Sequence, residues 1–516
     1  MLTVMLMALL ACNGESDPKA RDSGPTEPTD TTPTGTTPAG TTPSGTTPAG
    51  TTPTGTTSTG TTPTGTTPTG TTPTGTTPAA PLNVLVMLVD DLGLDKVGVY
   101  GAHPDPPPTP NIDALAAEGV RFTNAYSAPA CSPTRAALLT GRYGRRTGIG
   151  EVVFLRRDPE GLSRDEITLP EMLQLADEPW STLIVGKWHL AVTADPDFAR
   201  DPLEQGFDHH AGSLDNLTVT VEDRPGVGYH LWEKTVDGVT AWEETYATTD
   251  SVDEALARIP EMAEPWLTYV AFNAIHTPFQ LPPPELTPTT EDQPYVPPVI
   301  VAGMTEALDI EIGRLLDGLD PALRERTVIL LVSDNGTTRE AILPPWDENR
   351  SKLTLFDGGC RVPLIMAGPT VTAPGSTSDA LVHVVDVFAT VADLANVDLS
   401  TLRDPDGDPV PVDGRSLMPY LADPSAPSQR DLAYSERMGP NGGPPYRERD
   451  IRMVRDERYK LIRSRDGDQF FEYAPGAWSE GEDLLAGDGL DADQADAYAR
   501  LSDGLEALQA ELESGW

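Results

Sequence analysis

The chain has 516 residues and a formal net charge of −43, from 36 lysines and arginines against 79 aspartates and glutamates. This acidic balance argues against a nucleic-acid partner, which requires a basic face. It does not exclude an anionic substrate, because the local charges of a site govern what binds there. The three cysteines, Cys12, Cys131 and Cys360, form no CxxC pair, so neither a disulfide framework nor a zinc site is predicted.

Residues 1–12 read MLTVMLMALLAC. The apolar run is too short to span a bilayer, which takes roughly 20 residues, and it is typical of a signal-peptide core. Its ending, Leu9-Leu10-Ala11-Cys12, resembles a bacterial lipobox, in which the cysteine is lipidated. The alternatives are an ordinary cleaved signal or no signal peptide. We expect an exported bacterial protein, anchored by the lipid on Cys12 to a membrane at the periplasmic face or the cell surface.

A repeat of the form TTPTG, TTPAG and TTPSG follows, within residues 13–80. Proline in nearly every unit disfavours helix, glycine adds flexibility, and no large apolar side chain is present to bury. Such a segment cannot offset the entropy cost of ordering, so we predict a disordered stalk.

From residue 82 onward, apolar strands alternate with helices. The run NVLVMLVDDLG is continuous and ends in two aspartates, which is the pattern of a strand buried on both faces. STLIVGKWHL, LTYVAFNAIHTPF and TVILLVSDNG repeat this pattern. Helices are predicted in TPNIDALAAEGVRF, with Thr109 as N-cap and Pro110 in the first turn, and from Met304 in MTEALDIEIGRLLDGL.

This alternation predicts an α/β fold with a large central, mostly parallel (mixed) sheet flanked by helices, and with functional groups at the carboxyl ends of the strands. The segments DIRMVRDERYKLIRS and DQFFEYAPG predict antiparallel strands, and the last residues predict a closing helix. We therefore divide the chain into a signal peptide (1–12), a stalk (13–80), an α/β domain (81–424) and a smaller C-terminal α+β unit (425–516).

Acidic side chains end two of the predicted strands. Asp90 and Asp91 follow the first, and Asp334 and Asn335 follow a later one. Each pair by itself is more typical of a solvated turn. Together they offer four oxygen-bearing side chains to one cation, and oxygen ligands favour calcium or magnesium over zinc.

Cationic side chains occupy similar places. Arg135, Lys187 and Lys352 lie near predicted strand or helix ends, as do the imidazoles of His189 and His276. A single lysine is more often a surface residue with a buried stem, and a single histidine is more often structural. Because histidine is the natural proton carrier near neutral pH, the ensemble indicates a site for an anion and for proton transfer.

These motifs resemble those of the type I, formylglycine-dependent sulfatases of the alkaline phosphatase superfamily. CSPTRAALLTG from Cys131 is similar to the first signature of the family, with Cys-x-Pro-x-Arg, and STLIVGKWHL is similar to the second. VDDLG, Ile275-His276-Thr277-Pro278, SDNG and KLTLFDGGCRVP match further blocks in the expected order, and QGFDHHAG resembles another segment. The resemblance covers the chain from about Pro81. Asp357 departs from it, because the family usually has Glu there, beside the site.

The resemblance implies that a separate maturing enzyme oxidises Cys131 to Cα-formylglycine after reading the short motif before folding. It also implies a calcium ion, in preference to magnesium, whose ligands are Asp90, Asp91, Asp334, Asn335 and the modified residue 131. The implied activity is that of a sulfuric ester hydrolase, arylsulfatase-like, acting on a sulfated small molecule or polysaccharide.

Roles for the remaining residues follow from the same resemblance. Arg135 would steady the formylglycine hydrate, and Lys187 and Lys352 would hold sulfate oxygens. His276 would protonate the departing alcohol, and His189 would act as the base that releases the enzyme-bound sulfate. One hydroxyl of the hydrate would attack sulfur to form a covalent sulfate ester, and the other would lose its proton as sulfate leaves.

Two alternatives stay open. Phosphate and phosphonate esters share the tetrahedral geometry of sulfate esters, so the same residues are compatible with hydrolysis of those compounds. The other alternative is a surface binding protein on a catalytically inactive version of the fold.

Overall fold

The computed structural model describes residues 82–217, 227–289 and 294–514. The predicted signal peptide, the predicted lipidation site Cys12 and the predicted repeat stalk lie outside the described residues. Within those ranges, no helix has both the length and the apolar character that crossing a membrane requires. Ala80–Trp516 form one compact unit, and the boundary predicted between residues 424 and 425 stays a prediction.

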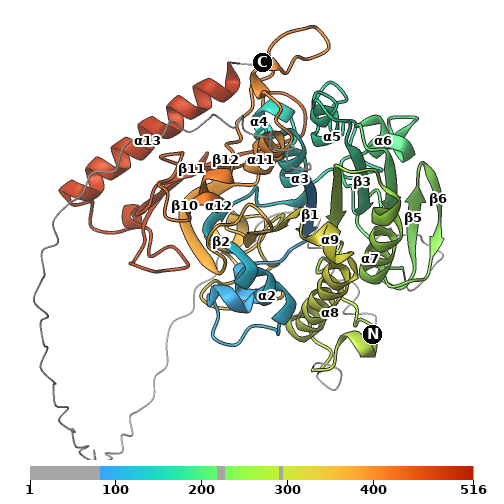
Figure 1. Ribbon diagram of the computed structural model, residues 1–516. Helices are drawn as coiled ribbons and strands as arrows, with labels where there is room; N and C mark the ends of the chain where they lie inside the picture. Colours follow the sequence, from blue (N-terminus) through green and yellow to red (C-terminus); the bar gives the residue numbers. More distant parts are fainter. Residues whose placement is uncertain (1–81, 218–226, 290–293, 515–516) are drawn as a thin grey trace, which may run out of the picture. The chain divides into compact units, whose positions relative to one another are not determined.

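A mixed ten-stranded sheet forms the centre of this unit (Figure 1). In spatial order its strands are β10 (Ser376–His383), β2 (Gly119–Tyr126), β9 (Leu364–Ala367), β8 (Thr327–Ser333), β1 (Asn83–Val89), β7 (Trp266–Ala271), β3 (Ser181–Gly186), β4 (His209–Gly212), β5 (Trp232–Val236) and β6 (Val239–Glu243). β1 pairs in parallel with β7 and β8. β3 pairs in parallel with β7 and β4, and β2 with β10, whereas β9, β5 and β6 run antiparallel to their neighbours. The large, mostly parallel sheet predicted from the sequence is therefore confirmed.

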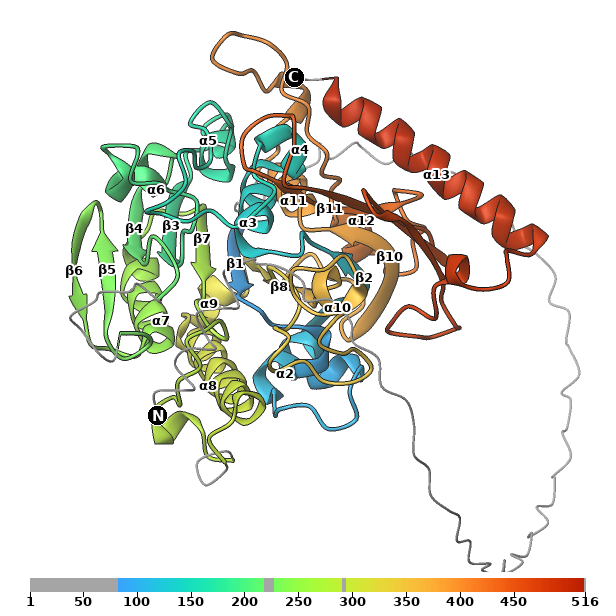
Figure 2. The same cartoon turned by 180° about the vertical axis from the view of Figure 1, so that it is seen from behind.

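Helices cover both faces of the sheet (Figure 2). The helices are α2 (Pro110–Glu118), α3 (Cys131–Thr140), α4 (Gly144–Thr147), α5 (Leu169–Leu173), α6 (Asp201–Glu204), α7 (Ala247–Arg258), α8 (Pro297–Gly318), α9 (Pro321–Arg324), α10 (Asp357–Cys360), α11 (Asp386–Leu394) and α12 (Met418–Ala422). On one face of β1, Val84 and Val86 belong to an apolar cluster with residues of α3, α5 and α11. On the other face, Leu85 and Met87 belong to a cluster with residues of α2, α7 and α8. Because both faces are buried, the strand is apolar at every position after Asn83.

Thr109 is a position where the predicted helix cap and the observed hydrogen bonds differ. It is the N-cap residue of α2, as predicted, but its side chain makes no capping hydrogen bond to the helix. Its hydroxyl accepts a hydrogen bond from the backbone N–H of Gly98 at 3.1 Å instead. The hydroxyl also donates to the side chain of Asp113 at 3.3 Å, so its partners are Gly98 and Asp113 in place of a backbone N–H of the helix.

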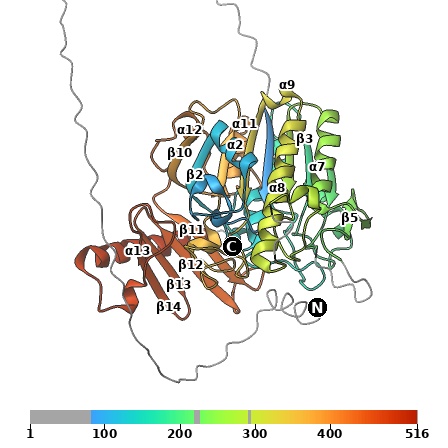
Figure 3. The same ribbon diagram turned by 90° about the horizontal axis from the view of Figure 1, so that it is seen from below.

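The C-terminal part forms a separate antiparallel sheet, of order β11 (Ala433–Gly439), β12 (Arg449–Arg455), β13 (Tyr459–Ser464) and β14 (Gly467–Glu472). The long helix α13 (Ala492–Glu513) lies beside these strands (Figure 3). Its buried Leu501 and Leu505 belong to the same cluster as Leu461 and Phe470 of the sheet. The antiparallel strands and the closing helix predicted from the sequence are therefore confirmed.

A buried group of charges joins α10 to the C-terminal sheet. Lys460 of β13 donates hydrogen bonds to Asp357 at 2.7 Å and to Glu480 at 2.6 Å, and all three side chains are buried. Arg361 lies 3.3 Å from the other carboxylate oxygen of Asp357. The sequence analysis placed Asp357 beside the catalytic site, whereas its carboxylate turns toward the C-terminal sheet and its charge has a structural role.

Replacing Lys460 with methionine is expected to lower the free energy of unfolding by about 3–5 kcal/mol, because Asp357 and Glu480 would remain buried with less positive charge to offset them. Chemical denaturation followed by circular dichroism measures the change. The double variant Lys460→Met, Asp357→Asn is the control, and it should recover part of the loss because one uncompensated charge is removed. A loss below about 1 kcal/mol in the single variant would contradict the role of this pair.

The ion pair between Lys460 and Asp357 also makes the free energy of unfolding depend on pH. Burial by itself raises the pKa of Asp357, but Lys460, Arg455 and Arg361 hold it well below its ordinary value of 3.8. The stabilisation is therefore present above that ordinary pKa and is lost as the pH falls toward the folded-state pKa. The difference in unfolding free energy between wild type and Lys460→Met should narrow as the pH is lowered below 3.8.

Candidate active site

The acidic side chains at two strand ends lie together because β1 and β8 are parallel neighbours, with Val89 opposite Ser333. Carboxylate oxygens of Asp90, Asp91 and Asp334 lie within 4.8 Å of one another. The backbone N–H of Asp91 donates to Asp334 at 3.1 Å, and the side-chain amide of Asn335 donates to Asp91 at 2.7 Å. All four side chains are buried, which overturns the alternative of solvated turns.

This arrangement fits an oxygen-ligated cation. Among the described residues, Asp90 Oδ1, Asp91 Oδ2 and Asn335 Oδ1 are buried oxygens without a hydrogen-bond partner. Burial raises the pKa of Asp334 well above its usual value, and the nearby charge of Asp90 adds to the shift. Carboxylates crowded in this way are costly to ionise, and a divalent cation would remove that cost.

Three cationic side chains reach the same place. Arg135, from α3, donates to Asp90 at 3.2 Å and to Asp334 at 3.3 Å. Lys187, which follows β3, donates to Asp90, and Lys352 donates to Asp91. Lys187 is fully buried and Lys352 is 9% exposed, so neither is a surface lysine. Burial by itself raises the pKa of Asp90, but Lys187, His276 and Arg135 bring it well below its usual value.

Cys131 lies at the centre of these charges, as the first residue of α3. Its Sγ is 3.5 Å from Lys352 Nζ, and the thiol is almost completely buried. Although burial opposes ionisation, Lys187 and Lys352 lower the pKa of the thiol well below its usual value. Cys360, the other cysteine of the described part, is an ordinary core residue, and its burial raises its pKa to about 12.

Both predicted histidines belong to the site. Ligand atoms of His276, Asp90 and Cys131 lie within 4.8 Å of one another, and His276 Nε2 is 4.0 Å from Asp91. His189 is buried and lies close enough to Cys131 to contribute to the lowered pKa of its thiol, after Lys187 and Lys352. Every residue that the sequence analysis assigned to the catalytic or metal site, from Asp90 to Lys352, is thus brought into one region.

Two residues of this region were missed. Asp215 and Asn216 follow β4, and their side chains contact His189 and Lys187. With Arg156, Glu233, Thr235 and Thr240 they line a cavity of about 200 Å³. The signal that could have revealed them was their position, since they are polar residues just after the strand that contains His209 and His210. That strand, His209–Gly212, contains no run of apolar residues by which it could be recognised.

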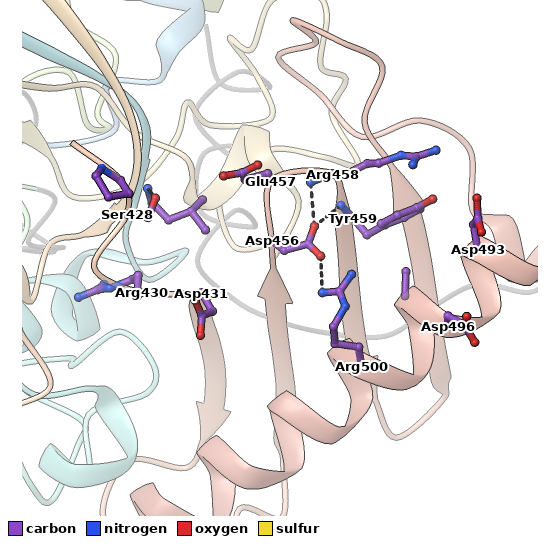
Figure 4. A pocket seen from close by; sticks show the side chains of 13 residues that line it. Ser428, Arg430, Asp431, Asp456, Glu457, Arg458, Tyr459, Asp493, Asp496 and Arg500 are labelled. Carbon is purple, nitrogen blue, oxygen red and sulfur yellow. Dashed lines mark hydrogen bonds and ion pairs between the residues drawn. The ribbon is translucent and has the colours of Figure 1, made fainter. Parts of the chain in front are cut away.

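A larger cavity of about 770 Å³ lies elsewhere, between the C-terminal sheet, α13 and residues 427–431 (Figure 4). Several of its charges are paired: Arg500 donates to Asp456 at 2.6 Å, and Arg458 donates to Glu472 outside the cavity. None of the catalytic candidates lines it, so the chemistry belongs to the strand ends of the large sheet.

The fold and the site together define a class of protein, a wound α/β protein whose strand ends gather buried carboxylates, cationic side chains and imidazoles in one centre. The sulfatase family model matches residues 82–397, and the chain belongs to the sulfatase family. The resemblance to the type I sulfatases of the alkaline phosphatase superfamily is confirmed.

Curated relatives agree with this assignment. Mouse arylsulfatase J is 32% identical over 61% of this chain and 52% of its own length. Human N-acetylgalactosamine-6-sulfatase is 34% identical over 66% of each chain. The chain therefore spans about half to two thirds of the length of these relatives.

Solved structures share the fold. Ps i-CgsB in complex with k-i-k-neocarrahexaose superposes with a TM-score of 0.68 at 23% identity, covering 84% of this chain and 94% of that one. BT4656 in complex with its substrate, D-glucosamine-2-N,6-O-disulfate, superposes with a TM-score of 0.61 at 21% identity, covering 84% and 98%. The PsFucS1 sulfatase from Pseudoalteromonas sp. is 26% identical, with a TM-score of 0.56 and coverage of 76% and 82%.

Proposed function

We propose that this protein hydrolyses sulfate esters through the oxidised side chain of residue 131. The observation that carries the proposal is the convergence of Lys187, Lys352, His189 and His276 on that one buried residue. Two ammonium groups suit the oxygens of a sulfate, and two imidazoles provide an acid and a base for the two halves of a double displacement.

The proposed nucleophile is the hydrate of formylglycine at position 131. Position 131 is the first residue of a ten-residue helix whose side chains are all buried. A separate maturing enzyme has no access to such a position in the folded protein, which supports oxidation before folding. The Nε atom of Arg135 has no partner among the described residues, so it is free to hold a hydroxyl of the hydrate.

The proposed cation is calcium, held by Asp90, Asp91, Asp334, Asn335 and the modified residue 131. The unpartnered oxygens described above support it, because hard divalent cations take oxygen ligands. When bound, the ion would offset negative charge on the sulfuryl oxygens. The side chains of Lys187 and Lys352 would hold the other oxygens.

A sulfate ester is proposed over a phosphate ester because the chain belongs to the sulfatase family. Three carboxylates, those of Asp90, Asp91 and Asp334, formally offset the three cations of Arg135, Lys187 and Lys352. The positive charge of a divalent cation would remain, and it would attract the anion of either ester. A phosphate or phosphonate ester hydrolase is the second candidate, and an inactive binding protein would need no such set of acid and base groups.

The alcohol part of the substrate is proposed to be a carbohydrate or an aryl group. The cavity beside His189 supports a sugar, because its lining offers hydroxyl, amide, carboxylate and guanidinium groups. Two structural neighbours hold carbohydrate ligands in their own complexes. Export and lipid anchoring, which rest on residues 1–80 alone, would bring this site to substrates outside the cytoplasm.

Mass spectrometry of the tryptic peptide 122–135 tests the nucleophile. After expression with a formylglycine-generating enzyme, the peptide should contain an aldehyde at position 131. The rate of aryl sulfate turnover should rise with the fraction of peptide that contains the aldehyde. Aryl phosphate should be turned over more slowly by the same preparation. A peptide that keeps its thiol in a fully active protein would contradict the proposal, and faster turnover of the phosphate would favour the second candidate.

A further inference from the structure

The imidazole of His189 is held from one side only. Its Nε2 lies 3.3 Å from Asp215 Oδ1 and 3.5 Å from the amide nitrogen of Asn216. Its Nδ1 is buried and has no hydrogen-bond partner among the described residues. One ring nitrogen therefore faces a carboxylate, and the other is available for chemistry.

The contact with Asp215 bears on which ring nitrogen carries the proton. An ionised carboxylate only accepts hydrogen bonds, so the 3.3 Å contact favours Nε2 as the donor. The amide nitrogen of Asn216 is itself a donor, and at 3.5 Å it competes weakly. Burial by itself raises the pKa of Asp215, but the hydrogen bond and the charge of His189 bring it below its usual value. The carboxylate thus remains ionised, and its contact with Nε2 favours a lone pair on Nδ1.

The carboxylate is also held in place. Asp215 Oδ1 accepts a hydrogen bond from the backbone N–H of Asn216 at 2.7 Å. The side-chain oxygen of Asn216 in turn accepts from Lys187 at 2.7 Å. His189 and Lys187, which the proposed function uses for different tasks, are therefore aligned by two consecutive residues after β4.

We propose that Asp215 is a positioning residue that holds His189 in the tautomer whose Nδ1 takes the proton from residue 131 when sulfate is released. The inference rests on the proposed function. In this step the free hydroxyl of the sulfated hydrate gives its proton to Nδ1 of His189. The carbon–oxygen bond to sulfate breaks, its electron pair leaves with sulfate, and the aldehyde carbonyl forms again. Asp215 stabilises the resulting imidazolium through the Nε2–H.

The Asp215→Asn variant tests this role in the matured, calcium-loaded protein with an aryl sulfate. Turnover should fall by roughly 10–100-fold, the usual effect of losing a carboxylate that orients a histidine. kcat/KM should stay close to wild type, because it reports the steps up to sulfate transfer, which do not use this base. Sulfate should accumulate covalently on peptide 122–135 during turnover, and Asp215→Glu should restore part of the rate.

A matched control exists elsewhere in the chain. Asp237 lies 2.8 Å from His209 Nδ1 at an exposed position, and it is not among the residues that line the cavity beside His189. The Asp237→Asn variant removes a His–Asp pair of the same kind and should leave kcat, kcat/KM and the peptide mass unchanged. An equal fall of kcat and kcat/KM in Asp215→Asn without retained sulfate would overturn the proposal, and so would wild-type turnover.

A second measurement separates this inference from the proposed function. The ¹⁵N shifts of the His189 ring report which nitrogen carries the proton, whether or not the protein is active. Wild type should show Nε2–H, and Asp215→Asn should show a shift toward Nδ1–H. The same tautomer in both proteins would overturn the role of Asp215, whereas a wild type without sulfate ester turnover would overturn the proposed function alone.

Discussion

Replacing Cys131 with alanine is expected to abolish sulfate ester turnover, with a loss of roughly a million-fold in kcat, as when the nucleophile of a double-displacement enzyme is removed. The reason is that the other groups of the site act on residue 131. Lys352 lies against it, and Lys187 and His189 both lower the pKa of its thiol. Alanine has no group to oxidise, so no nucleophile forms. Steady-state assays with an aryl sulfate measure the loss.

Cys360→Ala is the matched control for this variant. Cys360 is also buried, and its raised pKa is that of an inert core thiol. Its removal should change stability by no more than the loss of a small core group and should leave turnover largely intact. Circular dichroism should show that both variants fold. Turnover by Cys131→Ala within tenfold of wild type would refute the assignment of the nucleophile.

Asp334→Asn is expected to lose the response to calcium as well as turnover, by roughly a thousand-fold or more. Calcium at about a hundred times its dissociation constant should stabilise wild type by about 2.7 kcal/mol, because it binds the folded state alone. The variant should show little of this gain. Thermal melts with calcium and with a chelator, together with isothermal titration calorimetry, measure the response.

Without calcium, the thermal melts should compare the stability of Asp334→Asn with that of the metal-free wild type. Burial, together with Asp90 and Cys131, makes a charge on Asp334 unfavourable in the metal-free protein. Asparagine has the same shape without the charge, so the metal-free variant should be at least as stable as metal-free wild type. Asp317→Asn, at an exposed position of α8, is the control and should keep the calcium response. A full calcium response in Asp334→Asn would show that the ion binds elsewhere.

The predicted side chains lie together where polar residues follow the ends of strands. Asp90 and Asp334 follow continuous apolar runs, and such runs are local features that a sequence displays directly. Lys187 and His276 follow two other strands in the same way. Since parallel strands place their carboxyl ends at one edge, recognising the strands was enough to bring these side chains together.

Side-chain contacts were not predicted where they join two segments that carry no apolar run or motif pointing to the partner. Asp215 follows β4, a strand of only four residues, and nothing in its neighbourhood indicates His189 as a partner. Asp357 was placed beside the site by its motif, yet its carboxylate pairs with Lys460, 103 residues later. Both interactions depend on how separate elements pack.

The sequence by itself determined the class of fold, the strand ends and the chemical types of the reacting groups, because apolar periodicity and residue identity are properties of short segments. Only the tertiary structure decided the partner of each group. Lys352 meets Asp91 across 261 residues of chain, and Asp91 meets Asn335 across 244. Such pairings follow from strand order and helix packing, which result from burying the whole apolar surface at once.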